Sequence, residues 1–323
     1  MKSFVILSLV AAVAVVRAQS SSNSSASPLI PTNISTGCSS FLSALNSNSS
    51  LSSCVSSVVS ATSAFGPLGN SSNVTSTGDI NTTLNSLCSS SSACPDAVIR
   101  GQLASFYTAC TDELTGSSPN TDVIRIYDVL YAIEPLTKAA CTKDDSGRYC
   151  TAQISSGTSA SNATGSSKSV STSQQNAYQL VQNSLWQSFM PSTKRDDATN
   201  ASALLPNMTT FRSENVLFLF FSPNMSSSAL CVPCARNVLT AYINFEQNIE
   251  YALGIANSPM LGGLPELYSA ATSICGSNFL SGAVQAAGGL EGGLISGAMP
   301  HATIESGVFS VAAAAIFGLA ALL

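Results

Sequence analysis

The chain has 323 residues, of which only 9% are charged, and its formal net charge at pH 7 is −5. Soluble domains average about 25% charged residues, and here Ser and Thr, about a quarter of the chain, take their place. The acidic balance argues against nucleic acid as a partner, because binding to a duplex needs concentrated Lys and Arg. Ten cysteines, an even number, are too many for a reducing compartment, so the sequence does not predict a cytosolic enzyme.

The chain begins with the pattern of a secretory signal peptide, which we expect over residues 1–18. Lys2 precedes an apolar run from Phe4 to Val16, and small residues occupy the −3 and −1 positions of a cleavage site at Ala18. A membrane anchor is the alternative, but the run is too short to cross about 30 Å of hydrocarbon as a helix. We therefore expect cleavage after Ala18 and export.

The chain ends with the pattern of a GPI-attachment signal. An apolar run over 308–323 follows a polar spacer over 299–307, and small residues precede the spacer. A single transmembrane helix is the alternative, but the run is short and lacks the basic flank that fixes orientation. We expect Ser296 to carry the lipid that holds the protein on the membrane, with Gly297 or Ser281 as alternatives. Whether the lipid is later exchanged for a link to cell-wall glucan stays open.

The expected processing removes the only histidine, His301. A mature chain without histidine lacks the base of Ser-His-Asp and Cys-His nucleophiles and the histidine ligands of catalytic zinc and iron sites. The acidic pairs at 112–113 and 144–145 are interpreted as solvated surface charge, because adjacent carboxylates rarely face each other across a substrate. Glu246 and Glu250 lie four residues apart on a predicted helix, which leaves a pocket role open. We expect no enzyme, no catalytic residue, no metal site and no cofactor.

Composition divides the chain into two helical parts and their polar connections. Stretches with few apolar residues are expected to stay extended, and Ser/Thr-rich tracts of exported chains are usual O-glycan acceptors. The expected organisation is a Ser/Asn-rich tail at 19–36, a Cys-rich helical part at 37–150, a Ser/Thr-rich linker at 151–212 with one helix near 177–190, a second helical part at 213–281, a Gly-rich tether at 282–296 and a removed propeptide at 297–323.

Apolar residues recur at three- and four-residue intervals in five stretches, which predicts helices. These are 80–88, 96–114, a stretch from its N-cap at Thr121 until Pro135 interrupts it, 178–189 with Trp186 beside the apolar stripe, and 234–252, the longest. Only 216–221 is a continuous apolar run, and it is readable as a buried strand or as part of a buried helix. The sequence therefore predicts an all-α fold.

Ten Asn-x-Ser/Thr sequons predict N-glycosylation on exposed backbone, and we expect about half of them to be used. They lie at Asn23, Asn33, Asn48, Asn70, Asn73, Asn81, Asn162, Asn200, Asn207 and Asn224. None occurs between residues 83 and 149 or after Asn224, so these spans are expected to hold the packed core.

The ten cysteines are expected to form a disulfide framework, because an exported chain with an even count normally pairs all of them. They are Cys38, Cys54, Cys88, Cys94, Cys110, Cys141, Cys150, Cys231, Cys234 and Cys275. Seven precede the linker and three follow it, so complete pairing requires at least one bridge between the two helical parts. Cys231 and Cys234 form a Cys-x-x-Cys motif, but no βαβ pattern surrounds it, so we interpret both residues as structural rather than redox-active.

Lys194 and Arg195 are the only adjacent pair of basic residues. Proteases of the secretory pathway cut after such pairs where the backbone is exposed, so cleavage after Arg195 is a hypothesis. The alternative is a solvated charge cluster within the linker. A chain cut there would stay joined by the bridge between the two parts.

Several short segments together resemble an uncharacterised family of fungal secreted, Ser-rich, GPI-anchored cell-surface proteins with a Cys-rich helical domain of unknown function. The segments are Leu51-Ser-Ser-Cys54, Cys88 with Cys94, Ala109-Cys110-Thr-Asp-Glu-Leu114, Tyr127-Asp128-Val-Leu130, Lys143-Asp-Asp-Ser-Gly-Arg-Tyr-Cys150, Cys231-Val-Pro-Cys234, Tyr242, Phe245-Glu246 and Ile274-Cys-Gly276. The resemblance covers residues 38 to 280. It implies secretion and a wall or plasma-membrane location, and it brings no activity and no functional residues.

Together these patterns predict a non-enzymatic, GPI-anchored glycoprotein on the extracellular face of the plasma membrane or in the cell wall. The alternative is a surface module whose helices enclose an apolar ligand, a lipid or a sterol. A third interpretation, a carboxylate-dependent hydrolase, requires two acidic side chains that face each other across a cleft about 5–9.5 Å wide.

Overall fold

The computed structural model describes residues 30–62, 77–89, 95–155, 186–189 and 203–280. These residues form a helical fold, as predicted, with one short two-stranded hairpin. The elements are α2 (Thr36–Asn46), α3 (Ser49–Thr62), α4 (Thr77–Leu87), α5 (Asp96–Ala109), α6 (Thr111–Thr115), α7 (Thr121–Ala140), α8 (Cys150–Ser155), β1 (Trp186–Phe189), β2 (Ala203–Pro206), α10 (Met208–Ser213), the 3-10 turn η3 (Val216–Phe218), α11 (Ser227–Leu230), α12 (Pro233–Asn248), the 3-10 turn η4 (Ile255–Asn257) and α13 (Leu264–Cys275).

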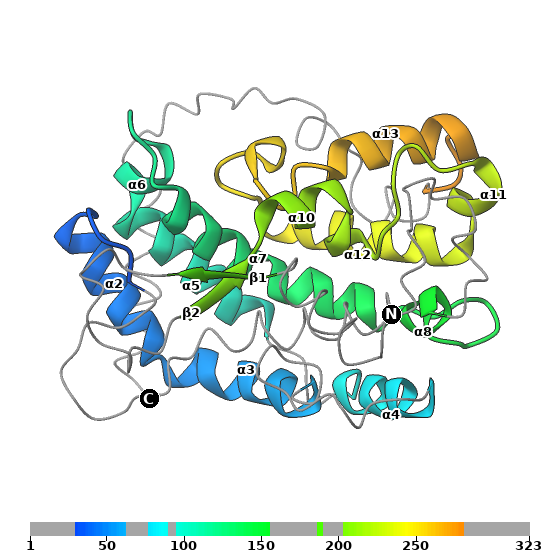
Figure 1. Ribbon diagram of the computed structural model, residues 1–323, viewed down its shortest axis with the longest axis horizontal. Helices are drawn as coiled ribbons and strands as arrows, with labels where there is room; N and C mark the ends of the chain where they lie inside the picture. Colours follow the sequence, from blue (N-terminus) through cyan, green and yellow to red (C-terminus); the bar gives the residue numbers. More distant parts are fainter. Residues whose placement is uncertain (1–29, 63–76, 90–94, 156–185, 190–202, 281–323) are drawn as a thin grey trace.

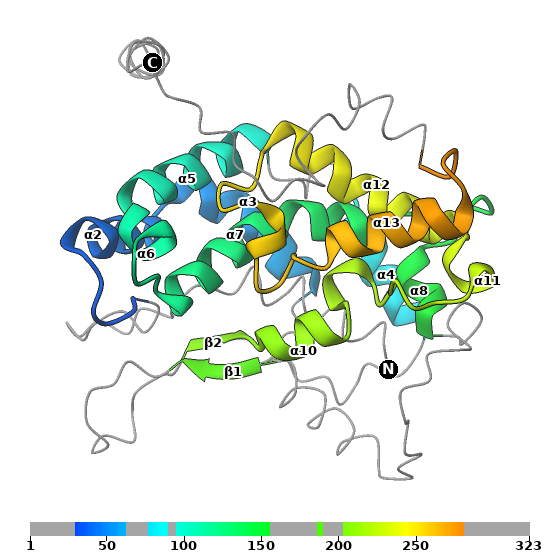
Figure 2. The same ribbon diagram turned by 90° about the horizontal axis from the view of Figure 1, so that it is seen from above.

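Helix α7 lies in the middle of the molecule, with α5 and α12 packed against it (Figure 1, Figure 2). Helix α2 packs on α5, and α3 packs on α4. From Tyr127 to Leu136 every residue of α7 is buried. A helix that is apolar on all of its faces is stable only inside the protein, so α7 is the element around which the others are organised.

The ends of α7 differ from the prediction. The N-cap is Asn120 rather than Thr121, and its side-chain oxygen accepts hydrogen bonds from the backbone N–H groups of Asp122 and Val123 at 3.0 and 3.2 Å. The helix also continues through Pro135 to Ala140 instead of stopping there. Proline removes one backbone hydrogen bond, but the close packing around this part of α7 keeps the helical path.

The predicted helix at 80–88 is confirmed as α4, and the one at 96–114 is confirmed with a break at Cys110 between α5 and α6. The apolar stripe of α5 faces inward, with Ile99, Leu103 and Phe106 buried. The predicted helix at 234–252, expected to be the longest, needs correction. Helix α12 ends at Asn248 and is shorter than α7, because the chain after Asn248 turns back over the core instead of continuing the helix.

The predicted helix at 178–189 is wrong for its described residues. Trp186–Phe189 is a strand, β1, which pairs antiparallel with β2 so that Trp186 lies opposite Pro206 and Phe189 opposite Ala203. Residues 178–185 lie outside the described residues. The partner strand belongs to the stretch predicted as polar linker, and a pairing between separate segments leaves no mark on the helical periodicity of either one.

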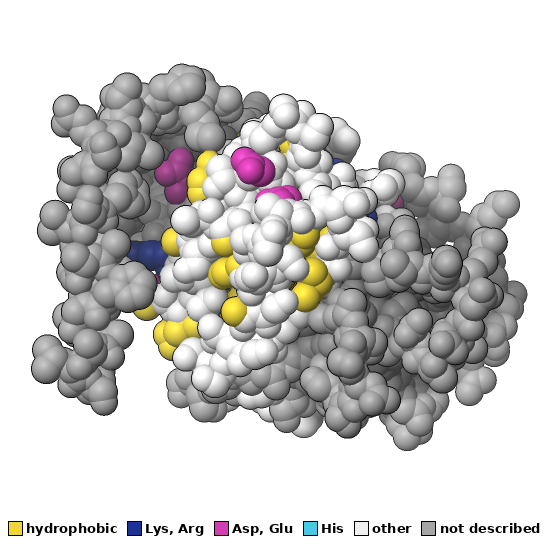
Figure 3. Space-filling model, turned by 90° about the vertical axis from the view of Figure 1, so that its left-hand side faces the viewer, with side chains coloured by type: hydrophobic (Ala, Val, Ile, Leu, Met, Phe, Trp, Pro, Cys, Tyr) yellow, Lys and Arg dark blue, Asp and Glu magenta, His cyan; other side chains and the backbone are white. Residues whose placement is uncertain are grey.

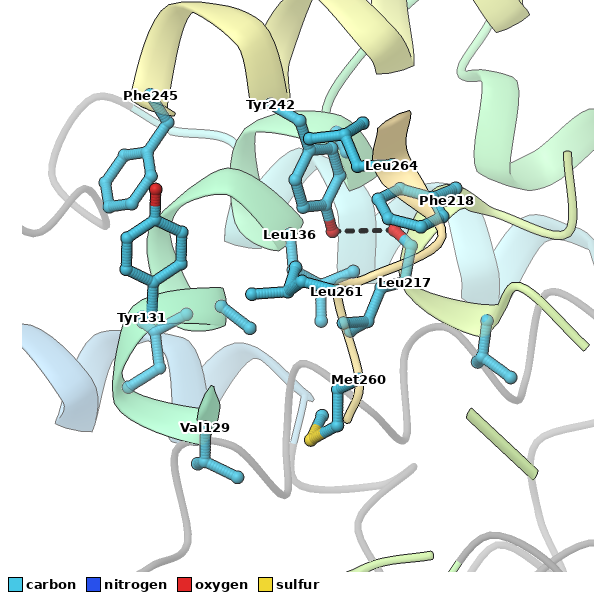
Figure 4. Close-up of a cluster of buried hydrophobic side chains, with 14 of the residues drawn as sticks. Val129, Tyr131, Leu136, Leu217, Phe218, Tyr242, Phe245, Met260, Leu261 and Leu264 are labelled. Atoms are coloured by element: carbon cyan, nitrogen blue, oxygen red, sulfur yellow. Dashed lines mark hydrogen bonds between the residues drawn. The ribbon is translucent and has the colours of Figure 1, made fainter. Parts of the chain in front are cut away.

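The apolar run at 216–221 is neither a strand nor an α-helix. Val216–Phe218 forms a 3-10 turn, flanked by Asn215, Leu219 and Phe220, all with φ between 50° and 65°. A left-handed backbone costs about 1–2 kcal/mol per residue with a side chain, so the turn depends on tertiary contacts. The buried hydroxyl of Tyr242 provides one by donating to the carbonyl oxygen of Leu217 at 2.6 Å (Figure 4).

Four disulfides link the described residues: Cys38–Cys110, Cys88–Cys141, Cys150–Cys234 and Cys231–Cys275. The bridge from Cys150 to Cys234 joins the two helical parts, which confirms the parity argument. The Cys-x-x-Cys pair is structural, as predicted, because Cys231 and Cys234 each bond to a different distant cysteine. The side chain of Cys54, and all of Cys94, lie outside the described residues.

Within the described ranges, no helix combines the length and the apolarity that a bilayer crossing requires. The expected signal peptide at 1–18, the tether at 282–296, Ser296 and the propeptide at 297–323 all lie outside the described residues.

Candidate functional site

The sequons of the described residues lie at the surface or partly exposed. Asn33, Asn81 and Asn224 are exposed, and Asn48 and Asn207 are half-buried. Asn48 caps α3, because its Oδ1 accepts a hydrogen bond from the N–H of Leu51 at 2.9 Å. A glycan attached to Nδ2 leaves that oxygen free to accept, so the cap and the modification are compatible. Asn23, Asn70, Asn73, Asn162 and Asn200, together with Lys194 and Arg195, lie outside the described residues.

The prediction of solvated charge at 112–113 holds for one of the two acidic residues. Asp112 is exposed, but Glu113 is buried with 6% of its surface exposed, so the interpretation as solvated charge is wrong for Glu113. Its Oε1 accepts a hydrogen bond from the N–H of Ser35 at the N-terminus of α2, at 2.5 Å, a position that favours negative charge. The sulfurs of Cys38 and Cys110 lie within 4.8 Å, but they form a disulfide and are not thiolate ligands for a metal.

The acidic pair at 144–145 lies in a tight turn that joins α7 to α8, closed by a bridge between Lys143 and Tyr149. Asp144 accepts hydrogen bonds from the backbone N–H groups of Ser146 and Arg148, both at 2.9 Å, and forms an ion pair with Arg148. The backbone N–H of Arg148 is the main cause that lowers the pKa of Asp144. Asp144 is therefore committed to the turn, whereas the exposed Asp145 faces Arg236 of α12 at 3.6 Å.

The largest group of perturbed side chains lies where α7 and α12 meet the chain segment between α12 and α13. Asp128 of α7 is completely buried. Its Oδ1 accepts a hydrogen bond from the hydroxyl of Tyr251, and its Oδ2 accepts from the hydroxyl of Ser258 at 2.8 Å and from the N–H of Met260 at 3.1 Å. Burial is the largest influence and raises the pKa of Asp128 to about 6, while the three hydrogen bonds oppose it.

Glu246 of α12 is the second buried acid of this group, with 8% of its surface exposed. Its Oε2 contacts the hydroxyl of Tyr131, which also lies 2.7 Å from the carbonyl oxygen of Ile249. Its Oε1 accepts a hydrogen bond from the N–H of Tyr251 at 3.4 Å. Burial is the largest influence and raises the pKa of Glu246, the hydrogen bonds from Tyr131 and from the N–H of Tyr251 oppose it, and the charge of Glu250 raises it further. Glu246 and Glu250 do not share a pocket, because Glu246 is buried and Glu250 is exposed.

Aromatic rings surround the two acids and extend across the core. Tyr251 packs edge-on against Tyr127 and Tyr131, with ring centres 5.5 and 5.0 Å apart. Tyr131 packs in the same way on Phe245, 4.9 Å away, as Figure 4 shows. Burial raises the pKa of each of these tyrosines, so all three stay protonated and act as hydrogen-bond donors.

Among the described residues, no Lys or Arg forms an ion pair with Asp128 or Glu246. The two cations of α7 form ion pairs elsewhere: Arg125 pairs with Asp122 at 3.4 Å, and Lys138 pairs with Glu134 at 3.1 Å and with Asp96 of α5 at 3.2 Å. The carboxylate oxygens of Asp128 and Glu246 instead accept hydrogen bonds from tyrosine and serine hydroxyls and from backbone N–H groups. This arrangement can hold protons and fix the chain between α12 and α13, and it does not present a carboxylate to a substrate.

The sequence indicated a pocket role for Glu246 of this cluster but none for Asp128, which belongs only to the resemblance segment Tyr127-Asp128-Val-Leu130. A usable signal was present: apolar residues occupy every face of the segment around Asp128, which is typical of a fully buried helix. A charged residue inside such a helix needs partners in the core, and Tyr131, three positions further on, is on the same side of α7.

Comparison with known proteins places the chain in a family. Residues 25–190, about half of the chain, match the domain of unknown function DUF7729, and the chain belongs to this family. The match contains α2 to α8 and β1, and it includes Asp128 and Tyr131 but ends before Glu246 and Tyr251. The chain matches no curated protein and no solved structure.

Proposed function

We propose that the protein is a non-enzymatic, disulfide-stapled helical module displayed outside the cell, held on the plasma membrane or in the cell wall by a GPI anchor at Ser296. The observation that carries the proposal is the state of the cysteines. All eight whose side chains are described are in disulfides. Such a framework is stable in oxidising compartments and is rare in the cytosol.

The buried acids support the absence of catalysis. Asp128 and Glu246 have the raised pKa values expected of catalytic acids, but their oxygens contact tyrosine hydroxyls, Ser258 and backbone N–H groups. A general acid must reach the substrate at hydrogen-bond distance. We therefore assign both acids to the fixation of the fold.

The surface supports a role in display. On the end of the molecule where α2 and α6 lie, apolar side chains form small groups within a surface that carries few charges (Figure 3). Among the side chains whose exposure the structure describes, Ile274 is the only large apolar one that is exposed, at 41%. The exposed sequons Asn33, Asn81 and Asn224 are accessible for N-glycosylation. No contact described above favours the alternative, a module that binds a lipid or a sterol, which stays a prediction.

The test is release from intact cells. The full chain is expressed in a eukaryotic secretory host, and the cells are treated with phosphatidylinositol-specific phospholipase C. We expect the protein to appear in the medium after treatment, and a chain that ends at Ser296 to appear there without treatment. Release only by a glucan-hydrolysing enzyme supports attachment to the wall.

Thiol counting provides the second measurement. Denatured, unreduced protein is expected to show no reaction with a thiol reagent, because every described cysteine sulfur is in a disulfide. Retention inside the cell with an uncut N-terminus, or free thiols at most of the ten cysteines, would show that the proposal is wrong.

A further inference from the structure

The chain between α12 and α13, residues 249–263, forms a strap over the core, and its hydrogen bonds to the two helices beneath it converge on two acids. Its first residue, Ile249, contacts the Tyr131 hydroxyl, and Tyr251, Ser258 and Met260 all donate to Asp128. The strap is visible in Figure 2 as the yellow-orange segment that crosses between α12 and α13 near α7. Its attachment therefore depends on the state of Asp128 and of Glu246, which contacts Tyr131.

Burial raises the pKa of Glu246, and the contacts of Tyr131 show how a neutral Glu246 is accommodated. A tyrosine hydroxyl has one proton to donate, and here it faces two oxygens, Oε2 of Glu246 and the carbonyl of Ile249. If Glu246 is ionised, both oxygens are acceptors and one of them is left without a proton. If Glu246 is protonated, its O–H donates to the Tyr131 oxygen and the Tyr131 hydroxyl donates to Ile249. Only the neutral acid satisfies every group, so the closed strap favours protonated Glu246.

Burial leads to the same preference at Asp128 and outweighs its three hydrogen bonds, which favour the ionised acid. The titratable groups around Asp128 are Tyr251 of the strap and Tyr127 of its own helix, and neither carries a positive charge. The groups around Glu246 are Tyr131 of α7, the N–H of Tyr251, and Glu250 of the strap, whose charge opposes ionisation. A buried carboxylate without a cation gains solvation when the segment that covers it opens.

We propose that the 249–263 strap is a pH-sensitive lock, closed on α7 while Asp128 and Glu246 are neutral and released as these acids ionise. This inference does not rest on the proposed function. The sign follows from linkage: the pKa of Asp128 is about 6 in the closed state and 3.8 as its ordinary value, so the closed state binds more protons between these values. The stabilisation is complete below the ordinary pKa and declines as the pH rises through about 6.

Release of the strap exposes aromatic surface. Tyr251 leaves its edge-on contacts with Tyr127 and Tyr131 when the strap opens. The opening is local, because α5, α7 and α12 keep the contacts with one another that do not involve the strap. The lock therefore couples acidity to the accessibility of one apolar region beside α7.

Hydrogen exchange measured by mass spectrometry on the full glycosylated protein tests this proposal. Protection of strap peptides is compared at pH 5 and pH 8 after correction for the intrinsic exchange rate, with peptides from α5 as the internal reference. The shift of Asp128 alone predicts that strap opening becomes about tenfold more frequent at pH 8. Reference peptides are expected to keep their protection.

Three variants test which acid causes the pH response of the strap. Glu246→Gln keeps a donor toward Tyr131 and an acceptor for the Tyr251 N–H but cannot ionise, so the strap is expected to lose less protection at pH 8 than in the wild type. Glu250→Gln removes the same charge from an exposed position and is expected to preserve most of the pH response. Asp128→Asn removes the second ionisation and is expected to reduce the response about tenfold.

Each possible result either supports or overturns the proposal. Strap protection that is equal at pH 5 and pH 8 overturns the proposal, as does a Glu250→Gln variant that abolishes the response while Glu246→Gln retains it. Equal loss of protection in the strap and in α5 indicates global unfolding and also overturns a local lock. If Glu246→Gln does not fold, the comparison of wild type with Asp128→Asn decides alone.

Discussion

The bridge between Cys150 and Cys234 offers the sharpest test of how the two helical parts hold together. It joins the start of α8 to the first turn of α12 across 84 residues of sequence. The perturbation is the double substitution Cys150→Ala with Cys234→Ala, which removes the bridge without leaving a free thiol to exchange with the others. Both sulfurs are buried, so the substitution also removes some packing.

The magnitude follows from the length of the closed loop. In the chain-entropy treatment, a loop of this size stabilises the folded state by about 4.5 kcal/mol at 25 °C. No other described disulfide provides a shortcut within the loop, because Cys231 pairs with Cys275 outside it and the remaining bridges precede Cys150. The full separation of 84 residues therefore sets the loop entropy that the bridge removes from the unfolded chain. A typical domain is stable by about 5–15 kcal/mol, so the loss is a large share of the total.

The noncovalent contacts between the same segments are too weak to replace the bridge. The contact of the Gln153 side chain with the Cys234 sulfur at 3.9 Å is lost with that sulfur. Two polar contacts remain: the ion pair of Arg236 with Asp145 at 3.6 Å and the hydrogen bond from the Asn237 side chain to the carbonyl oxygen of Lys143 at 2.8 Å. Both are exposed, and exposed pairs contribute about 0–1 kcal/mol. Arg236→Ala is therefore the matched control, with an expected loss below about 1 kcal/mol.

The assay is urea unfolding followed by far-ultraviolet circular dichroism, after non-reducing peptide mapping has verified the other bridges. We expect the double variant to lose about 4–5 kcal/mol in the free energy of unfolding. A loss below about 1 kcal/mol, equal to that of Arg236→Ala, would refute the reasoning from loop entropy. It would mean that packing around α7 alone holds the second helical part in place.

Sequence reasoning succeeded where the signal is local or arithmetical. The helices α4 and α5 have one apolar face each, so three- and four-residue spacing located them to within a few residues. The bridge between the two parts followed from an odd number of cysteines on each side of the linker. Neither argument required knowledge of which residues meet in the folded chain.

It failed where the outcome depends on distant partners. The helix beyond Pro135 persists because α7 is packed on all sides, and that packing is contributed by segments far away in sequence. Trp186 to Phe189 is a strand because Ala203–Pro206 pairs with it. The sequence predicts a solvated Glu113 and assigns no role to Asp128, because a charged residue is normally solvated. Their burial depends on donors from Ser35 and from the strap, which only the fold brings near.

Two further substitutions test contacts that the fold places around α7 and α12. Asn120→Ala removes the cap from two N–H groups at the start of α7 and is expected to lower the free energy of unfolding by about 0.5–2 kcal/mol, measured by urea unfolding; an unchanged value would contradict the cap. Tyr242→Phe leaves the buried carbonyl of Leu217 without its donor, which costs about 1–3 kcal/mol. Because that carbonyl lies in the turn held between left-handed Asn215 and Leu219, the loss of the donor should also free the turn. Faster hydrogen exchange over 215–221 than over α12 is the expected result, and equal exchange in both segments would show that the apolar contacts of the turn fix it without the Tyr242 hydroxyl.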